Sequence, residues 1–99
     1  ILDVGTGNGT WLLEMAAEFP DAQLTGIDLV HQAPTSVLPP NCTFKVMDAL
    51  HGLRFPDASL DYIHHRYVCS VPADRWGAYL ADCARVLRPG GWIEVMESD

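Results

Sequence analysis

The chain has 99 residues, which is enough for one domain at most, and its 13 acidic and 6 basic residues give a net charge of -7. This charge and the lack of a basic cluster argue against a surface for nucleic acid, and no apolar run approaches the roughly 20 residues of a membrane span. Three widely spaced cysteines without a C-x-x-C pattern argue against a disulfide framework or a zinc site, and they favour an intracellular location, cytoplasmic or nuclear.

The first half of the chain alternates predicted strands with a helix and an irregular crossover. Residues 1–4 are short and apolar, which predicts a buried strand. Apolar residues recur at helical spacing over residues 10–19, and the sequence Pro-Asp that follows ends this predicted helix. Residues 23–28 form a second predicted strand. Three prolines within residues 31–40 predict an irregular crossover in place of a helix.

The second half continues the alternation. Residues 42–47 alternate as a third strand, residues 49–59 have the composition of a loop, and residues 60–64 form a fourth predicted strand. Residues 72–87 carry one continuous apolar face, which predicts the best helix of the chain, ended by the sequence Pro-Gly-Gly. Residues 92–96 form a fifth predicted strand.

Strands that alternate with helices or crossovers imply a parallel sheet with right-handed connections. The strands are apolar, so we expect helices on both faces and a doubly wound α/β domain. In this architecture a ligand binds outside the carboxyl ends of the strands, at the switch point beside the first strand.

Three alternating glycines follow the first predicted strand: Gly5, Gly7 and Gly9. The first would let the chain bend sharply, the second would let a ligand approach the backbone, and the third would let the helix pack closely on the sheet. An ordinary strand-to-helix turn needs only one glycine, so the pattern indicates a nucleotide-like ligand.

The spacing of the glycines selects among ligands. A dinucleotide fingerprint, G-x-G-x-x-G, requires a glycine where this chain has Thr10. Asp3, just before the turn, is also a poor neighbour for a diphosphate and suits a ligand whose near end carries an ammonium group. A nicotinamide-dependent oxidoreductase is therefore the less favoured alternative.

Two further acids follow predicted strands. Asp28 ends the second strand, where a carboxylate can accept hydrogen bonds from both hydroxyls of a ribose, although an aspartate there can also simply cap a turn or helix. Asp48 ends the third strand and could accept a bond from an adenine amino group, with the Ala49 N–H facing a ring nitrogen. Acids at strand ends are common, so an ordinary turn remains an alternative for Asp48.

Five segments, in order and at proper spacing, together resemble the Rossmann-like class of S-adenosylmethionine-dependent methyltransferases. They are ILDVGTGNG, GIDL, MDA, FPDASLDYIHHR and VLRPGGWIEVMES. The resemblance implies strand order 3-2-1-4-5 and a donor-binding core over residues 1–99 that stops before strands six and seven. The proline-rich crossover, the sequence His-His-Arg and GGWIEVMES look closest to fungal LaeA-like methyltransferases, which are often tied to secondary metabolism.

The resemblance also implies roles for particular residues toward S-adenosylmethionine. The donor's methionine part would lie on the backbone of the turn, with Asp3 supporting that end; the residues that form this cradle are Gly5, Thr6, Gly7 and Gly9. Asp28 would bind the ribose and Leu29 would pack on the adenine. The adenine edge would be bound by Asp48 and Ala49, and the donor's amino group would lie near the backbone of His65 and Arg66.

Methyl transfer from a sulfonium depends largely on alignment, and a general base is needed only if the acceptor must lose a proton early. His64 and His65 end the fourth predicted strand and are the candidates for such a base, but adjacent strand residues point to opposite faces, so at most one faces the pocket. Both can instead be structural. We expect a small-molecule or protein acceptor and no metal, and a non-catalytic regulator that keeps the same fold is a further alternative.

Overall fold

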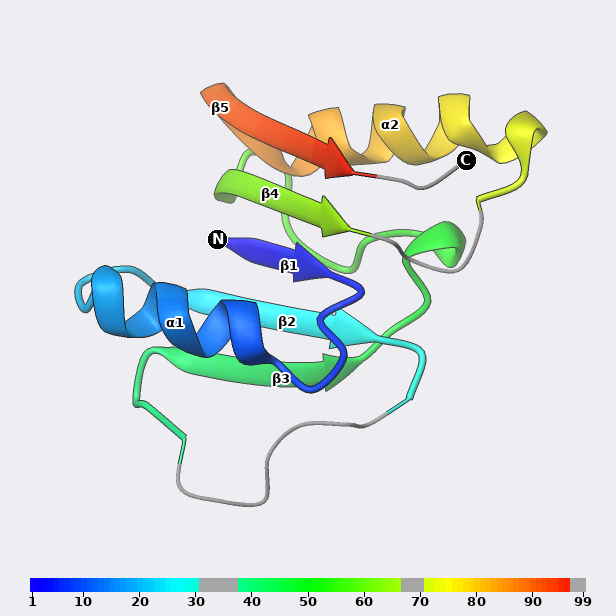
Figure 1. The fold of residues 1–99 in the computed structure, drawn as a ribbon. Helices are drawn as coiled ribbons and strands as arrows, with labels where there is room; N and C mark the ends of the chain where they lie inside the picture. Colours follow the sequence, from blue (N-terminus) through cyan, green and yellow to red (C-terminus); the bar gives the residue numbers. More distant parts are fainter. Residues whose placement is uncertain (31–37, 67–70, 97–99) are drawn as a thin grey trace.

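Five parallel strands form the centre of the protein, in a computed structural model that describes residues 1–30, 38–66 and 71–96 (Figure 1). The strands are β1 (Leu2–Val4), β2 (Leu24–Asp28), β3 (Cys42–Val46), β4 (Leu60–Arg66) and β5 (Leu87–Met96). The helices are α1 (Thr10–Glu18) and α2 (Trp76–Val86), with short 3-10 helices η1 (Ala49–His51) and η2 (Ala73–Arg75).

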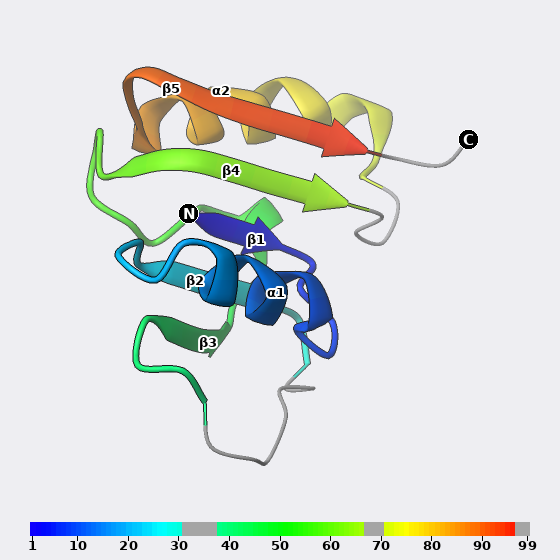
Figure 2. The same ribbon diagram turned by 60° about the vertical axis from the view of Figure 1, so that its left-hand side comes forward.

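The strand order is β3-β2-β1-β4-β5, and every neighbouring pair is parallel, which confirms the predicted order and fold class. Strand β1 lies at the centre, with Leu2 opposite Thr25 of β2 on one side and Ile63 of β4 on the other. Helix α1 covers one face of the sheet and α2 the opposite face (Figures 1 and 2). The switch point predicted from the sequence is therefore the carboxyl end of β1.

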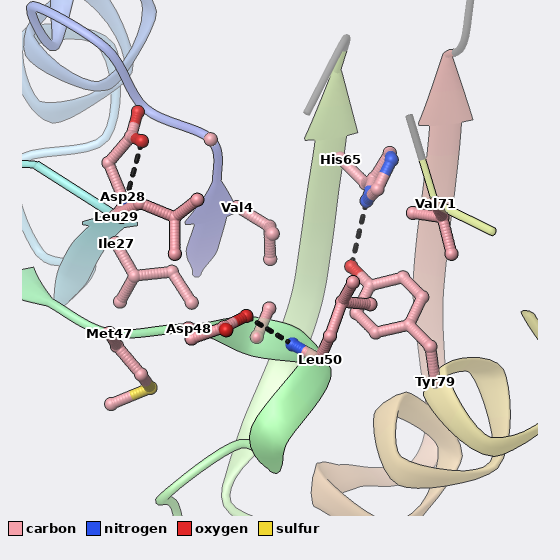
Figure 3. A pocket seen from close by; sticks show the side chains of 12 residues that line it. Val4, Ile27, Asp28, Leu29, Met47, Asp48, Leu50, His65, Val71 and Tyr79 are labelled. Carbon is pink, nitrogen blue, oxygen red and sulfur yellow. Dashed lines mark hydrogen bonds between the residues drawn. The ribbon is translucent and has the colours of Figure 1, made fainter. Parts of the chain in front are cut away.

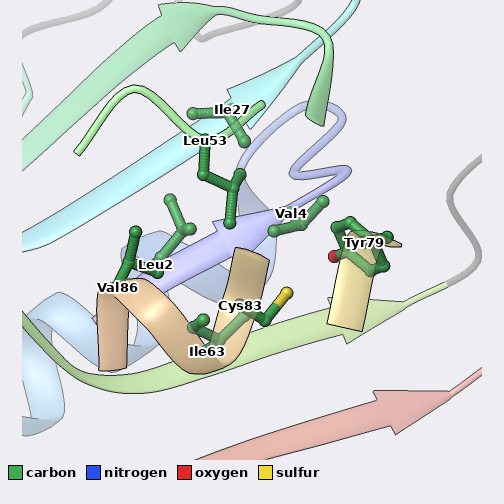
Figure 4. Close-up of a cluster of buried hydrophobic side chains, with 8 residues drawn as sticks. All are labelled: Leu2, Val4, Ile27, Leu53, Ile63, Tyr79, Cys83 and Val86. Atoms are coloured by element: carbon green, nitrogen blue, oxygen red, sulfur yellow. The ribbon is translucent and has the colours of Figure 1, made fainter. Parts of the chain in front are cut away.

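Two separate hydrophobic clusters fill the two faces. On the α2 face, strand residues such as Leu2 and Ile63 pack against Tyr79, Cys83 and Val86 of α2 (Figure 4). On the α1 face, a smaller cluster consists of Leu12, Ala16, Leu24 and Cys42. Because side chains alternate along a strand, Leu2 and Val4 face α2 while Asp3 between them faces α1.

The last strand differs from its prediction. Strand β5 begins at Leu87, which pairs with Leu60 of β4 ahead of the sequence Pro-Gly-Gly, so these three residues lie within the strand and do not separate it from α2. Leu60 pairs with Leu87 but Tyr62 already pairs with Trp92, so β5 carries extra residues in a bulge. Gly90 has φ +84°, a conformation that permits this bulge at no steric cost.

Two smaller differences concern the ends of elements, and a third concerns a predicted loop. The helix predicted over residues 72–87 begins as the 3-10 turn η2, and β4 extends to Arg66 instead of ending at residue 64. The loop predicted over residues 49–59 contains η1, because the Asp48 carboxylate accepts the Leu50 N–H and caps this turn.

The cysteines that the structure describes, Cys42 and Cys83, are buried free thiols. Burial raises the pKa of Cys83 to about 11, so this thiol stays protonated at neutral pH. Cys69 and most of the predicted crossover, residues 31–37, lie outside the described residues. In the described part of the chain, neither helix is long and apolar enough to cross a membrane.

Gly9 joins the turn to α1, and we expect Gly9→Ala to lower the free energy of unfolding by about 2–5 kcal/mol. Its φ is +82°, and a Cβ there would lie 2.5 Å from the Phe44 ring, so backbone strain adds to overpacking. Urea unfolding measures the effect. Gly77→Ala is the matched control: nothing lies within 4 Å of a Cβ there, and the change should stabilise the helix by about 0.5–1 kcal/mol. Equal effects at both positions would contradict the close packing of Gly9.

Candidate functional site

A cavity opens at the carboxyl ends of β1, β2 and β4, beside the glycine turn (Figure 3). Apolar side chains make most of its wall, with the carboxylates Asp28 and Asp48 at its edge (Figure 3). The described lining residues are Val4, Gly5, Ile27, Asp28, Leu29, Met47, Asp48, Ala49, Leu50, His65, Val71 and Tyr79. The position agrees with the switch point expected for a doubly wound sheet.

The glycine turn is tied to β2 by its own backbone. The N–H groups of Gly5 and Thr6 both donate to the Ile27 carbonyl, at 2.9 and 3.0 Å. All three glycines have positive φ, between 57° and 82°, so each occupies a conformation that other residues avoid. The backbone conformation of the turn therefore explains why all three positions are glycine.

Asp28 lies between the turn and the cavity. Its Oδ2 accepts the Gly7 N–H at 2.8 Å and its Oδ1 accepts the Leu29 N–H at 2.7 Å. An ionised carboxylate has about four acceptor positions, so one lone pair on each oxygen is left after these two bonds. The geometry thus lets Asp28 shape the turn and still accept two hydroxyl groups.

The opposite wall of the cavity is the turn η1. Asp48 Oδ1 accepts the Leu50 N–H at 3.0 Å, and its Oδ2 lies 3.5 Å from His51 Nδ1. Arg75 of η2 donates to the Leu50 carbonyl at 2.6 Å. A charged side chain thus holds the η1 backbone from outside the cavity, while Ala49 and Leu50 face into it.

The two adjacent histidines of β4 point to opposite faces, as alternation predicts. His65 lines the cavity, with its Nδ1 2.8 Å from the Tyr79 hydroxyl (Figure 3), and its ring packs near Trp76. His64 lies on the α1 face, where its Nδ1 donates to Asp3 at 2.9 Å. Of these two histidines, it is therefore His65 that lies at the cavity.

The structure brings together six of the predicted donor-binding residues around the cavity: Gly5, Asp28, Leu29, Asp48, Ala49 and His65. Asp3 is not among the described lining residues, because its carboxylate faces α1. The Thr6 side chain packs against Gly26 beneath the turn, and its buried Oγ1 has no partner among the described residues. Of Arg66, only the backbone lies within the described part.

Sequence reasoning missed Tyr79 and Leu50 as cavity residues. Tyr79 belongs to the apolar face of the predicted helix, where the periodic pattern indicates only a packing role. Its hydroxyl group is the one feature that indicates a possible hydrogen bond at a site. Leu50 lies in a segment whose composition indicates a loop, and nothing in that composition shows that Arg75 holds it against the sheet.

A comparison with known protein families matches residues 1–91 to the model described as a methyltransferase domain. The chain belongs to this methyltransferase domain family. It is 34% identical over its whole length to the methyltransferase str3 of Strobilurus tenacellus, and 37% identical over 99% of its length to the secondary metabolism regulator laeA of Coprinopsis cinerea. The expected resemblance to fungal methyltransferases of secondary metabolism is thus confirmed.

Solved structures agree with this family. The chain matches a methyltransferase in complex with the Trm112 activator of Haloferax volcanii with a TM-score of 0.78 and 28% identity, over 93% of this chain and 41% of that one. It matches an S-adenosylmethionine-dependent methyltransferase of Methanosarcina mazei with a TM-score of 0.75 and 26% identity, over 93% of this chain and 49% of that one. The chain spans 35% of str3 and 24% of laeA, about a third or less of these relatives.

Asp82 and Arg85 of α2 hold the segment that follows η1. Asp82 Oδ2 accepts the Leu53 N–H at 2.5 Å, and Arg85 donates to the carbonyls of Leu53 and Phe55 at 2.6 and 3.0 Å. Burial alone would raise the pKa of Asp82, but the Leu53 N–H and the Arg85 guanidinium outweigh it and hold this pKa below its usual value.

We expect Asp82→Asn to reduce the dependence of stability on acid pH. A carboxyl whose folded-state pKa is depressed stabilises the fold above its unfolded pKa of about 4, and this contribution is lost as the pH falls through the folded-state pKa. The free energy of unfolding, measured by urea at about pH 2 to 6, should therefore fall less steeply with acid in Asp82→Asn than in the wild type. Asp74→Asn, at an exposed acid of η2, is the control and should keep the wild-type slope. Identical slopes in all three proteins would show that Asp82 does not have this role.

Proposed function

We propose that the protein is an S-adenosylmethionine-dependent methyltransferase that transfers a methyl group to a small-molecule or protein acceptor, and that this chain is its donor-binding core. The observation that carries the proposal is the position of Asp28, which holds the glycine turn through Gly7 and keeps two acceptor positions free at the cavity edge. Family membership and the fungal relatives support the same activity.

The residues present fit this donor. The cavity has apolar walls that suit an adenine ring, a carboxylate on either side for polar groups of a nucleoside, and a glycine at its floor where the backbone is open to contact. We expect Asp28 to accept the two ribose hydroxyls, and Asp48 with the Ala49 N–H to bind the adenine edge. When bound, the donor supplies a methyl group already activated on a sulfonium.

The remaining tasks of the chain are to position the donor and the acceptor and to cover the bound donor. Leu29, half exposed at the mouth of the cavity, is placed to close over the base. His65 and Tyr79 form the wall at the end of β4, and His65 is the candidate base for an acceptor that must lose a proton. Alignment in such a site can supply roughly 7–11 kcal/mol, so an acceptor without an acidic proton needs no base.

A second candidate function is a regulator that keeps the donor site and acts through protein partners. The similarity to the secondary metabolism regulator laeA of Coprinopsis cinerea favours it. Methyl transfer from labelled S-adenosylmethionine to a broad panel of small molecules and proteins separates the two functions. Donor binding without turnover supports the regulator, whereas a labelled product supports the enzyme.

We expect the full-length protein to bind S-adenosylhomocysteine, the demethylated product, in isothermal titration calorimetry, and Asp28→Ala to weaken this binding at least about 100-fold. Each hydrogen bond to a charged group contributes about 1.5–3 kcal/mol, and the change removes the proposed bonds to the ribose.

Asp21→Ala is the matched control for this test. Asp21 is an exposed aspartate between α1 and β2, at the opposite end of the sheet, so the same change should leave the affinity as it is. A folded Asp28→Ala protein with wild-type affinity would reject the ribose assignment. Absence of heat for the wild type at millimolar product would reject donor binding as a whole, and an increase in fluorescence on mixing with reduced nicotinamide cofactor would instead support the oxidoreductase alternative.

A further inference from the structure

A cluster of three side chains from distant parts of the sequence lies on the α1 face, directly beneath the glycine turn. We call Asp3, Trp11 and His64 the Asp–Trp–His cluster. His64 Nδ1 donates to Asp3 Oδ1 at 2.9 Å, and the His64 ring stacks on Trp11 with centroids 3.8 Å apart and planes 8° from parallel. The cavity residues lie on or above the other face, so the donor site described above does not account for this cluster.

The cluster is built around a carboxylate that water does not reach. Asp3 is only 3% exposed and His64 only 1%. A buried carboxylate is tolerated when a paired, hydrogen-bonding group compensates it, and removing that group leaves an uncompensated charge. His64 supplies this group. The Glu94 carboxylate of β5 lies 3.8 Å from the other nitrogen of His64, so the imidazole lies between two carboxylates.

The positions of the three residues connect the cluster to the turn. Asp3 lies in β1 two residues before Gly5, and Trp11 is the second residue of α1. The turn between them contains three glycines at positive φ. Because glycine has no side chain, these residues do little to make the turn rigid. Its backbone bonds tie it to β2. His64 ties both ends of the turn to β4: its hydrogen bond holds Asp3 on one side, and its ring stack holds Trp11 on the other.

We propose that His64 and Trp11 are positioning residues for the methyl donor: by holding the Asp3 carboxylate and the first turn of α1, they keep the turn Gly5–Gly9 in its donor-binding shape. This inference rests on the proposed function, since it concerns the same donor. It gives the two histidines of β4 separate tasks, with His65 at the cavity and His64 beneath the turn.

The test measures the affinity of the full-length protein for S-adenosylhomocysteine by calorimetry, together with its thermal unfolding without ligand. We expect His64→Leu to weaken binding about tenfold or more, because affinity falls in proportion to the fraction of molecules whose turn is competent. His64→Asn places an N–H at the position of Nδ1 and can keep the bond to Asp3 but not the ring stack on Trp11, so it should weaken binding by only about threefold, less than His64→Leu. This rescue is not expected if His64 only fills space.

Two further variants separate positioning from a general loss of stability. Val86→Ala removes buried volume under α2, away from the turn, and should lower the unfolding temperature without weakening binding. Trp11→Leu removes the stack but leaves the Asp3–His64 bond, and it should weaken binding to an intermediate degree. Trp92→Leu, at a tryptophan that is 74% exposed on β5, is its control.

Each outcome decides between the hypotheses. If the wild type does not bind, the proposed function is wrong. If the wild type binds and a folded His64→Leu protein binds equally well, or if His64→Asn is as weak as His64→Leu, the positioning role is wrong and the proposed function stands. If His64→Leu does not fold, Trp11→Leu decides, and wild-type affinity in that variant rejects the role.

Discussion

The arrangement of the whole site depends on β1, a strand of three residues that pairs with β2 on one side and β4 on the other. Because it is buried on both faces, each of its side chains must belong to one layer or the other. Leu2 and Val4 complete the core under α2, and Asp3 is left to the α1 layer. The glycine turn leaves the sheet at the end of this strand, so its starting point and direction are set by a strand that is buried and paired on both sides.

The carboxyl end of the sheet combines two kinds of support. On the side of β2 the turn is held by main-chain bonds to the Ile27 carbonyl and by the Asp28 carboxylate. On the side of β4 and α2 the support comes from side chains, with Arg75 and Arg85 bonded to carbonyls of the segment from Leu50 to Phe55. Bonds from a guanidinium to a carbonyl are strong where water is partly excluded, so these arginines order a segment that has little regular structure of its own.

Periodicity predicted the element order, the parallel sheet and the position of the cavity, because these follow from which residues are apolar and how they are spaced. It could not predict where β5 begins, since the first pair of this strand joins Leu87 to the distant Leu60 and lies ahead of the turn-like sequence Pro-Gly-Gly. The same limit applies to Tyr79 and to the contact between Asp3 and His64. These residues are separated by long stretches of sequence from their partners, and only the register of β1 with β4 brings Asp3 opposite His64.

The bulge in β5 separates two properties that are usually linked in a strand, its length and its register. The strand meets β4 at Leu60 and again at Tyr62, while its own chain covers the distance from Leu87 to Trp92. Of the residues between, residues 88–90 are exposed and lie at the amino end of the strand, outside the paired register. A residue gained or lost there need not shift the carboxyl end of β5 against β4, so the register of the sheet beside the site does not depend on the length of the chain at the other end of the strand.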